Sequence, residues 1–213
     1  MFERGSVVYS ARYIMETNQE STSLNDIVNT ENVNRKSSFG GDVLEWLEAI
    51  AIAVMIVLLV FTFVLRQVIV QGESMVPTLQ SGDKLIISHL FYTPKQGDIV
   101  VVNCEGTNKL NKTLIKRVIA TENQVVDIDF TEGTVTVDGK VLKEDYINAL
   151  TTKNDGGFSY PVTVPKGSLF VMGDNRNHST DSRNSEVGFL DVDDVLGKAI
   201  FRILPISKFG FVE

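Results

Sequence analysis

An uncharged apolar segment from Ala49 to Leu65 constrains the fold of this chain more than any other feature. An α-helix rises about 1.5 Å per residue, so roughly 20 apolar residues cross the ~30 Å hydrocarbon core of a bilayer. With its flanks, the segment predicts one transmembrane helix over residues 42–66, with acidic residues in the first turns and Arg66 at the end, as the helix dipole favours. A buried core helix and a cleaved signal peptide are the alternatives. Both fit less well, because the segment has no polar face and a long tail without a basic start precedes it.

The residues before this segment have the composition of a tail. Residues 1–41 are rich in Asn, Ser, Thr and Glu, and their few large apolar residues follow no regular period. Such a segment buries too little surface to offset its ordering entropy, so we expect it to be disordered. The charges do not indicate on which side of the membrane this tail lies, because Arg35 and Lys36 before the span balance Arg66 and Lys84 after it.

The pattern after the span is that of β-strands. Short apolar or alternating runs are separated by Gly, Pro, Asn and Asp. They cover residues 84–88, 98–102, 113–120, 125–130, 168–172 and 195–204. Residues 134–142 predict a hairpin around an Asp-Gly turn. We therefore expect residues 67–213 to form a mainly β domain, built on an antiparallel sheet and long enough to bury its own core.

Composition excludes several classes of function. The net charge of -7, without clusters of Lys and Arg, argues against a nucleic-acid partner. The single cysteine, Cys104, excludes an intramolecular disulfide and a cysteine-based metal site. We expect Cys104 to be a packing residue, and the sequence predicts neither a metal nor a cofactor.

A serine lies in a turn-forming sequence shortly after the span. Gly72 permits a sharp turn, Pro77 fixes its own φ, and Ser74 lies between them. A serine that only forms the turn is one interpretation. Met75 and Leu79 favour a reactive serine, because they would line a small apolar pocket beside the hydroxyl.

A lysine in an apolar run is the candidate base. Strand alternation places Lys116 on a face with apolar neighbours only. An ordinary lysine is neutral in about one molecule in 2,500 at pH 7, and burial that lowers its pKa by about 3 to 5 units removes most of that deficit. A lysine on a solvated face, or one that reaches out at the rim, is the alternative. The chain has only two histidines, His89 and His178, so a Ser/Lys pair is the economical hypothesis.

A polar stretch, residues 173–183, follows an apolar run and so begins where a strand ends. Its Asp174, Arg176, Asp181 and Arg183 have opposite signs at short spacing, as expected for a network of paired charges. A polar loop with incidental charges is the alternative.

Together these motifs resemble those of the bacterial type I signal peptidases, the leader peptidases that use a Ser/Lys dyad. Each motif alone would be weak evidence, whereas four in the family's order are highly specific. The resemblance covers the span and all residues after it, and the short interval between Lys116 and Gly173 is similar to that of the shorter, single-span members. The motifs are Gly72-x-Ser74-Met75-x-Pro77-Thr78-Leu79, Gly97-Asp98-Ile99-Val100, Lys116-Arg117-Val118 and Gly173-Asp174-Asn175-Arg176-x-x-Ser179-x-Asp181-Ser182-Arg183.

The resemblance implies the roles of the reactive residues. It implies that Ser74 is the nucleophile, that Lys116 is the general base, and that Ser179 hydrogen-bonds the lysine amine and orients it. Some relatives have a serine at the position of Gly72, and its hydroxyl completes the oxyanion hole. The second oxyanion donor of this chain is therefore open, and a backbone N–H near Gly72 is a candidate.

The resemblance also implies supporting roles. Asp181 and Arg183 would form a structural ion pair, while Asp174 and Arg176 would brace the same region. Small residues at the first and third positions before the cut would enter shallow pockets. The candidates for the walls of those pockets are Met75, Leu79 and Ile115.

By the same resemblance, the expected function is that of a membrane-bound serine endopeptidase that removes signal peptides from exported preproteins. The expected partners are signal peptides, the lipid bilayer and, as a further candidate, the secretion translocon. The β domain would lie outside the cytoplasm, where substrates emerge, with residues 1–41 inside.

Two other classes remain as alternatives. An inactive membrane-anchored β domain, acting as a binding or scaffold subunit, would keep the fold without a reactive Ser74. A self-cleaving Ser/Lys repressor can share the β core, but it needs a DNA-binding helical module where this chain has its span.

Overall fold

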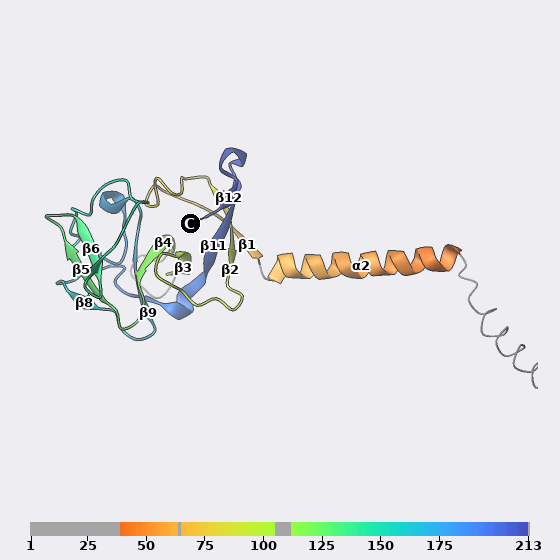
Figure 1. Cartoon of the computed structure of the whole chain (residues 1–213), viewed down its shortest axis with the longest axis horizontal. Coiled ribbons are helices and arrows are strands. Elements are labelled where there is room, and N and C mark those ends of the chain that lie inside the picture. The colour runs from red at the N-terminus through yellow and green to blue at the C-terminus, as the bar shows by residue number, and fades with distance from the viewer. Residues whose placement is uncertain (1–38, 64, 105–111, 213) are drawn as a thin grey trace, which may run out of the picture. The chain divides into compact units, whose positions relative to one another are not determined.

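The structure is a computed structural model that describes residues 39–63, 65–104 and 112–212. The long helix α2 (Phe39–Phe63) is drawn in orange in Figure 1. Its section Val43–Val60 is long and apolar enough to cross a membrane, and the described side chains there are exposed. The first 38 residues of the predicted tail lie outside the described residues.

The helix differs in its bounds from the prediction over residues 42–66. It begins at Phe39 and ends at Phe63, and Arg66 belongs to the first strand instead of the last helical turn. The last turn of α2 has no basic residue, so the prediction that Arg66 complements the helix dipole is wrong. Strand pairing explains the difference, because Arg66 lies opposite Ile87 in an antiparallel ladder.

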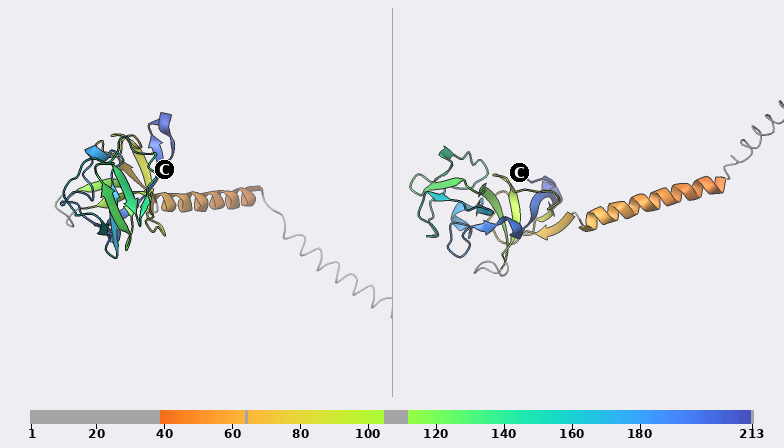
Figure 2. Two further views of the ribbon diagram at one scale, coloured as in Figure 1. Left: turned by 60° about the vertical axis from the view of Figure 1, so that its left-hand side comes forward. Right: turned by 90° about the horizontal axis from the view of Figure 1, so that it is seen from below.

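The residues after the helix are mainly β, as predicted. The larger sheet has the strand order β1-β2-β11-β3-β4-β9-β10, with β12 beside β11, and its pairings are antiparallel. Figure 2 shows this part of the chain from two further sides. The strands are β1 (Leu65–Ile69), β2 (Lys84–Ser88), β3 (Ile99–Asn103), β4 (Thr113–Ala120), β9 (Ser168–Met172), β10 (Leu190–Asp191), β11 (Val195–Leu204) and β12 (Gly210–Phe211).

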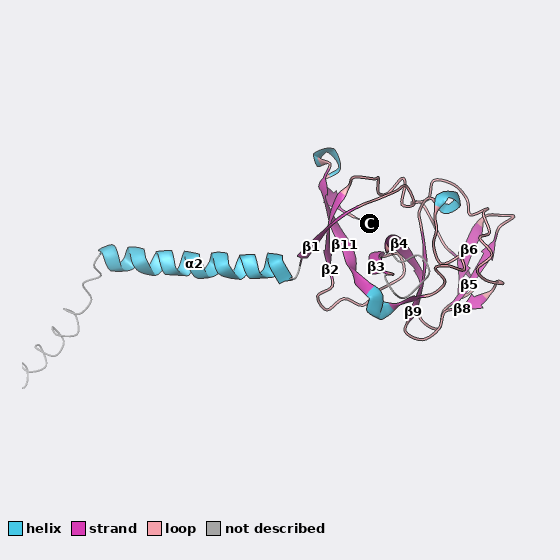
Figure 3. Ribbon diagram, turned by 180° about the vertical axis from the view of Figure 1, so that it is seen from behind, coloured by secondary structure: helices cyan, strands magenta, loops and turns pink. Residues whose placement is uncertain are grey.

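A smaller antiparallel sheet has the order β7-β6-β5-β8. Figures 1 and 3 show β5, β6 and β8 grouped apart from β1, β2 and β11. The predicted hairpin over 134–142 is present, and its turn residues Asp138 and Gly139 have φ of 50° and 76°. The strands are β5 (Val125–Asp129), β6 (Thr134–Val137), β7 (Lys140–Val141) and β8 (Val162–Thr163), and the short 3₁₀ helices are η1 (Arg176–His178), η2 (Val192–Asp194) and η3 (Ile206–Lys208).

Strand β4 runs through the part of the sheet that carries the candidate site. It pairs with β3, where Val100 lies opposite Lys116, and with β9, where Arg117 lies opposite Met172. Leu114 and Val118, two positions on either side of Lys116, are both buried in one apolar cluster that also includes Cys104. Because side chains alternate between the two faces of a strand, the Lys116 side chain lies on the same buried face of β4 as Leu114 and Val118.

Candidate active site

Ser74 lies in the long turn that connects β1 to β2. The base of the turn is closed by two backbone hydrogen bonds, from Val70 N–H to Asp83 O (2.8 Å) and from Gly82 N–H to Val70 O (2.9 Å). Met75 and Leu79 anchor the turn, because both are buried in the apolar cluster beneath it. Ser74 itself is only half-buried, so its hydroxyl is held by a fixed turn and still reachable.

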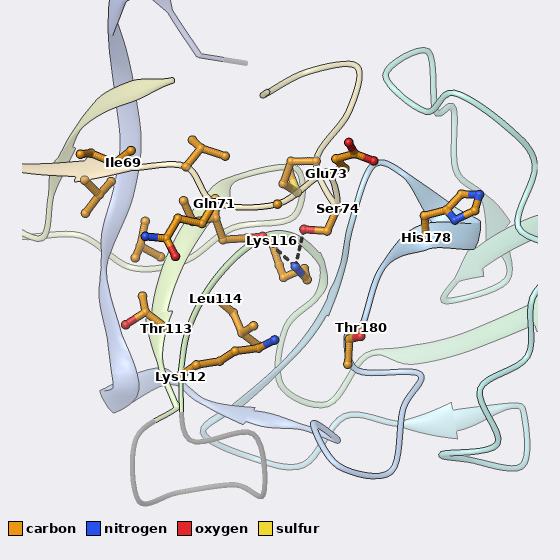
Figure 4. A pocket seen from close by; sticks show the side chains of 16 residues that line it. Ile69, Gln71, Glu73, Ser74, Lys112, Thr113, Leu114, Lys116, His178 and Thr180 are labelled. Atoms are coloured by element: carbon orange, nitrogen blue, oxygen red, sulfur yellow. Dashed lines mark hydrogen bonds between the residues drawn. The ribbon is translucent and has the colours of Figure 1, made fainter. Parts of the chain in front are cut away.

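Lys116 meets this serine from β4. Its side chain is buried, with 3% of the residue exposed. The amine Nζ donates one hydrogen bond to Ser74 Oγ over 2.7 Å and another to the Ile115 carbonyl oxygen over 3.1 Å. A turn and a strand thus bring a hydroxyl and an amine into direct contact, as Figure 4 shows.

Burial changes the acidity of this amine. Removal from water disfavours the charged ammonium and is the main reason why the pKa of Lys116 falls to about 8. The positive charge of Lys112 lowers the pKa further, while the negative charge of Asp181 acts in the opposite direction. The neutral amine, which can accept a proton, is therefore accessible near neutral pH.

An open cleft of about 740 Å³ lies in front of the pair. Residues 68–75 line one part of it and residues 112–116 line another, with Val101, His178 and Thr180 completing the lining. Met75 and Ile115, two of the three candidate pocket walls, are among these residues. Leu79 is not. It is fully buried in the core, because the turn directs it away from the cleft and into contact with the sheet.

Gly72 lies in the same turn, two residues before Ser74, and also lines the cleft. Its φ of +83° lies in the left-handed region, where a side chain is unfavourable. A Cβ built there would meet no atom within 4 Å, so conformation and not space explains the glycine.

Ser179 is buried beside Gly173, close to the backbone of Ser74. A Cβ placed on Gly173 would lie 2.3 Å from Ser179 Oγ and 2.4 Å from the Ser74 carbonyl oxygen. The Ser179 hydroxyl contributes to lowering the pKa of Asp181, but its oxygen has no hydrogen-bond partner of normal geometry among the described residues. The hydrogen bond that the family resemblance implies between Ser179 and the Lys116 amine is thus not formed in this structure.

Asp181 and Arg183 form a buried ion pair beneath this segment. Arg183 Nε and Nη2 donate to the two carboxylate oxygens of Asp181 over 2.9 and 2.8 Å, and the Gly173 N–H donates to Asp181 Oδ2 over 2.9 Å. Burial alone would raise the pKa of Asp181, but the hydrogen bonds and charge of Arg183 outweigh it and hold that pKa below its usual value. The carboxylate therefore stays ionised.

Asp174 and Arg176 each have a partner that the sequence analysis did not name. Asp174 accepts two hydrogen bonds from Arg117, over 2.9 and 2.7 Å, and one from Thr78 Oγ1 over 2.5 Å. Arg176 forms a close ion pair with Glu144. The sequence could have indicated a role for Arg117, because a charged residue inside a buried strand needs an opposite charge. The sequence contains no such indication for Glu144, since it lies in a loop after β7.

Comparison with known proteins decides the family. A family model described as signal peptidase, peptidase S26, matches residues 43–204. The chain belongs to this family. Signal peptidase I T of Bacillus subtilis is 36% identical over 190 residues, covering 84% of this chain and 94% of that protein. Probable signal peptidase I-1 of Synechocystis is 38% identical over 169 residues, covering 75% and 81%, and signal peptidase IB of Staphylococcus aureus is 32% identical over 187 residues, covering 80% and 94%. The family that the motifs predict is thereby confirmed.

Proposed function

We propose that this chain is a membrane-anchored serine endopeptidase that removes signal peptides from exported preproteins, with Ser74 as the nucleophile and Lys116 as the general base. The observation that carries the proposal is the 2.7 Å hydrogen bond between the buried Lys116 amine and Ser74 Oγ at the wall of an open cleft. Membership of the signal peptidase family supports the choice of substrate.

The chemistry is acyl transfer through a covalent intermediate. Neutral Lys116 accepts the hydroxyl proton as Ser74 Oγ attacks the carbonyl carbon of the scissile bond. The ammonium that results protonates the leaving amine, which departs as the new N-terminus of the mature protein. Lys116, neutral again, takes a proton from water, and the hydroxide attacks the acyl-enzyme. Release of the signal peptide carboxylate returns the proton to Ser74 Oγ.

The oxyanion that develops in each step needs donors at the nucleophile turn. The Ser74 backbone N–H and a backbone N–H near Gly72 are our candidates, because both belong to the turn that lines the cleft. Ser179 is assigned a positioning role on the basis of its burial beside Gly173, directly behind the nucleophile backbone. Loss of turnover without loss of folding in Ser179→Ala would support that role, and wild-type turnover would reject it.

The substrate would lie extended in the cleft, between residues 68–75 and residues 112–116. Met75 and Ile115 are the walls that we propose for the shallow pockets that accept small side chains before the cut. Leu79 supports the turn from the core and is dropped from that set.

We propose a topology with the N-terminus in the cytoplasm, α2 across the membrane, and residues 67–213 outside. Protease added to the outer face of spheroplasts should then degrade the β domain and spare residues 1–41. Protection of the β domain would reverse the orientation. The secretion translocon remains a candidate partner, and co-purification in mild detergent tests it.

The decisive experiment is cleavage of a preprotein by the detergent-solubilised chain, followed by sequencing of the new N-terminus. A cut directly after the signal peptide, absent in Ser74→Ala, is the expected result. An inactive scaffold subunit would produce no cut and would not react with a serine-directed acylating probe. Either of those outcomes with folded wild-type protein would overturn the proposal.

A further inference from the structure

A loop outside the cleft contacts Arg117, which is next to Lys116 in the chain, and Asn175, which is hydrogen-bonded to the backbone of Ser74. This loop, residues 144–148, follows β7 of the smaller sheet and is called the strap below. The Tyr146 ring lies under the Arg117 guanidinium, with 3.9 Å between the guanidinium carbon and the ring centroid. Arg117 directly follows the base Lys116 in β4, so this contact bears on the strand that carries the base.

The contact between Tyr146 and Arg117 is the start of a first line of contacts, which continues from Arg117 to the turn that contains Ser74. Arg117 donates two hydrogen bonds to Asp174, and Thr78 Oγ1 donates a third to the same carboxylate. Thr78 lies in the turn that contains Ser74. The ring of Tyr146 thus covers one side of a buried ion pair that joins β4 to the nucleophile turn, and it keeps water from that side.

A second line of contacts starts at Asn148. Its amide Nδ2 donates to Asn175 Oδ1 over 2.9 Å. Asn175 in turn donates from Nδ2 to the Glu73 carbonyl oxygen (3.1 Å) and from its backbone N–H to the Ser74 carbonyl oxygen (3.0 Å). The strap therefore sets the orientation of the Asn175 side-chain amide, and with it the hydrogen bond to the Glu73 carbonyl oxygen next to Ser74.

The strap is itself held in place by charge. Glu144 forms its ion pair with Arg176, which is fully buried and also donates to Thr151 Oγ1 over 2.9 Å. The Tyr146 hydroxyl donates to Glu144 Oε1 over 3.0 Å. Both lines of contact therefore begin at the strap, which the ion pair of Glu144 holds at its first residue.

We propose that the strap is a positioning element for the reaction, acting through Tyr146 on the side of the base and through Asn148 on the side of the nucleophile. It touches neither the cleft nor the reacting atoms, since none of residues 144–148 is among the residues that line the cleft. Its effect is to fix the Ser74 turn relative to β4, and a misplacement of 1 Å between reacting groups can cost about 100-fold in rate. The inference rests on the proposed Ser74/Lys116 dyad.

The test compares variants of the full-length enzyme in detergent. Tyr146→Leu removes the ring, Tyr146→Phe keeps the ring and removes only the hydroxyl, and Asn148→Ala removes the second line of contacts. Asp145→Ala is the matched control, because Asp145 is an exposed member of the same loop whose ion pair is with exposed Lys143. For each variant, kcat, KM and Tm are measured with a preprotein or signal-peptide substrate, and active sites are counted with a serine-directed acylating probe.

We expect Tyr146→Leu and Asn148→Ala to lower kcat per titrated active site by about 10- to 100-fold, with KM within about twofold of wild type. Tyr146→Phe should restore kcat to within about threefold, and Asp145→Ala should match wild type. A strap with a purely structural role would reduce the number of titrated sites and leave kcat per site unchanged, and this result would overturn the proposal. If Tyr146→Leu fails to fold, Asn148→Ala, which alters an exposed residue, decides the question by the same criterion.

Ser74→Ala, run in parallel, separates this inference from the proposed function. Turnover in Ser74→Ala would overturn the dyad and the strap together. Loss of turnover in Ser74→Ala with wild-type kcat in both strap variants would overturn the strap alone.

Discussion

The Lys116 amine lies 2.7 Å from the Ser74 hydroxyl oxygen, although the two residues are 42 positions apart in the chain. At this distance a proton can pass between them without an intervening water. A lysine with a pKa of about 8 is neutral in about one molecule in ten at pH 7, compared with about one in 2,500 for an ordinary lysine. The contact and the burial together give Lys116 the properties that the proposed general base needs near neutral pH.

The first prediction concerns the nucleophile. Ser74→Ala should abolish processing of a preprotein and keep the fold, because it removes only the attacking oxygen from a half-buried turn position. Ser74→Cys should retain a small part of the activity. Cleavage is measured by gel and circular dichroism confirms the fold. Wild-type turnover by the alanine variant would remove Ser74 from the mechanism.

The second prediction concerns pH. The proposed base Lys116 would act only when neutral, so kcat/KM should rise as the pH increases through about 8 and level off above it. Lys116→Arg should be inactive throughout this range, because a guanidinium stays protonated. The profile is measured from pH 6 to about 10 with a peptide substrate.

His178 provides the contrast for that experiment, since it is an exposed residue at the edge of the same cleft. No step of the mechanism uses an imidazole, so His178→Ala should keep most of the activity and the same pH profile. Activity in Lys116→Arg together with inactivity in His178→Ala would replace the Ser/Lys mechanism by a histidine mechanism.

The third prediction concerns the stability cost of the base. The pKa of Lys116 is about 8 in the folded state and about 10.5 when unfolded, so between these values the unfolded chain binds more protons and wild-type stability rises with pH. Below pH 8 the fold carries the whole penalty of a buried ammonium, about 3 kcal/mol. Lys116→Met should therefore unfold at higher denaturant concentration than wild type at pH 7, and the difference should shrink by pH 10. A difference that does not change with pH would contradict the lowered pKa.

The fourth prediction concerns Gly173, which lies between the Ser74 backbone and Ser179. In Gly173→Ala the new Cβ would meet the Ser74 carbonyl oxygen at 2.4 Å and Ser179 Oγ at 2.3 Å. The backbone of the nucleophile turn has to move, so we expect a loss of activity of at least about 100-fold. Gly167→Ala is a useful comparison, because a Cβ there has open space and only the strain of its φ of +74°. Equal activities in the two variants would show that the close packing at Gly173 is not important for catalysis.

The fifth prediction concerns specificity. The shallow pockets that we propose, with Met75 and Ile115 as walls, would accept only small side chains, so a preprotein with alanine at the first position before the cut should be processed. The same preprotein with phenylalanine there should not. Rates are compared at equal substrate concentration by gel, and equal rates would mean that the pocket walls are assigned incorrectly.

Much of the fold could be predicted because its signals are local. Alternation of apolar residues indicated the strand that carries Lys116, and the Asp-Gly pair marked the turn between β6 and β7. The boundary between helix and sheet could not be found in this way. Leu65 is apolar enough to extend a membrane span, and only its pairing with Ser88 in β2 makes it part of a strand.

The partners of the charged residues were less accessible to sequence reasoning. Asp181 and Arg183 are two positions apart, and their ion pair follows from proximity in the chain. Arg117 and Asp174 are 57 positions apart, and they meet only because β4 and β9 are neighbours. Glu144 and Tyr146 come from a loop with no periodic pattern, so their contacts with Arg176 and Arg117 depend entirely on tertiary structure.

The burial of Lys116 has a consequence for protein engineering. Because its amine is more costly inside the fold than an apolar side chain of similar length, a library selected only for heat resistance should enrich replacements at this position. With Lys116 as the general base that we propose, the variants that purify best would then be inactive. A programme to make this enzyme more robust has to select for turnover and thermal resistance together, or hold position 116 fixed and look for gains elsewhere.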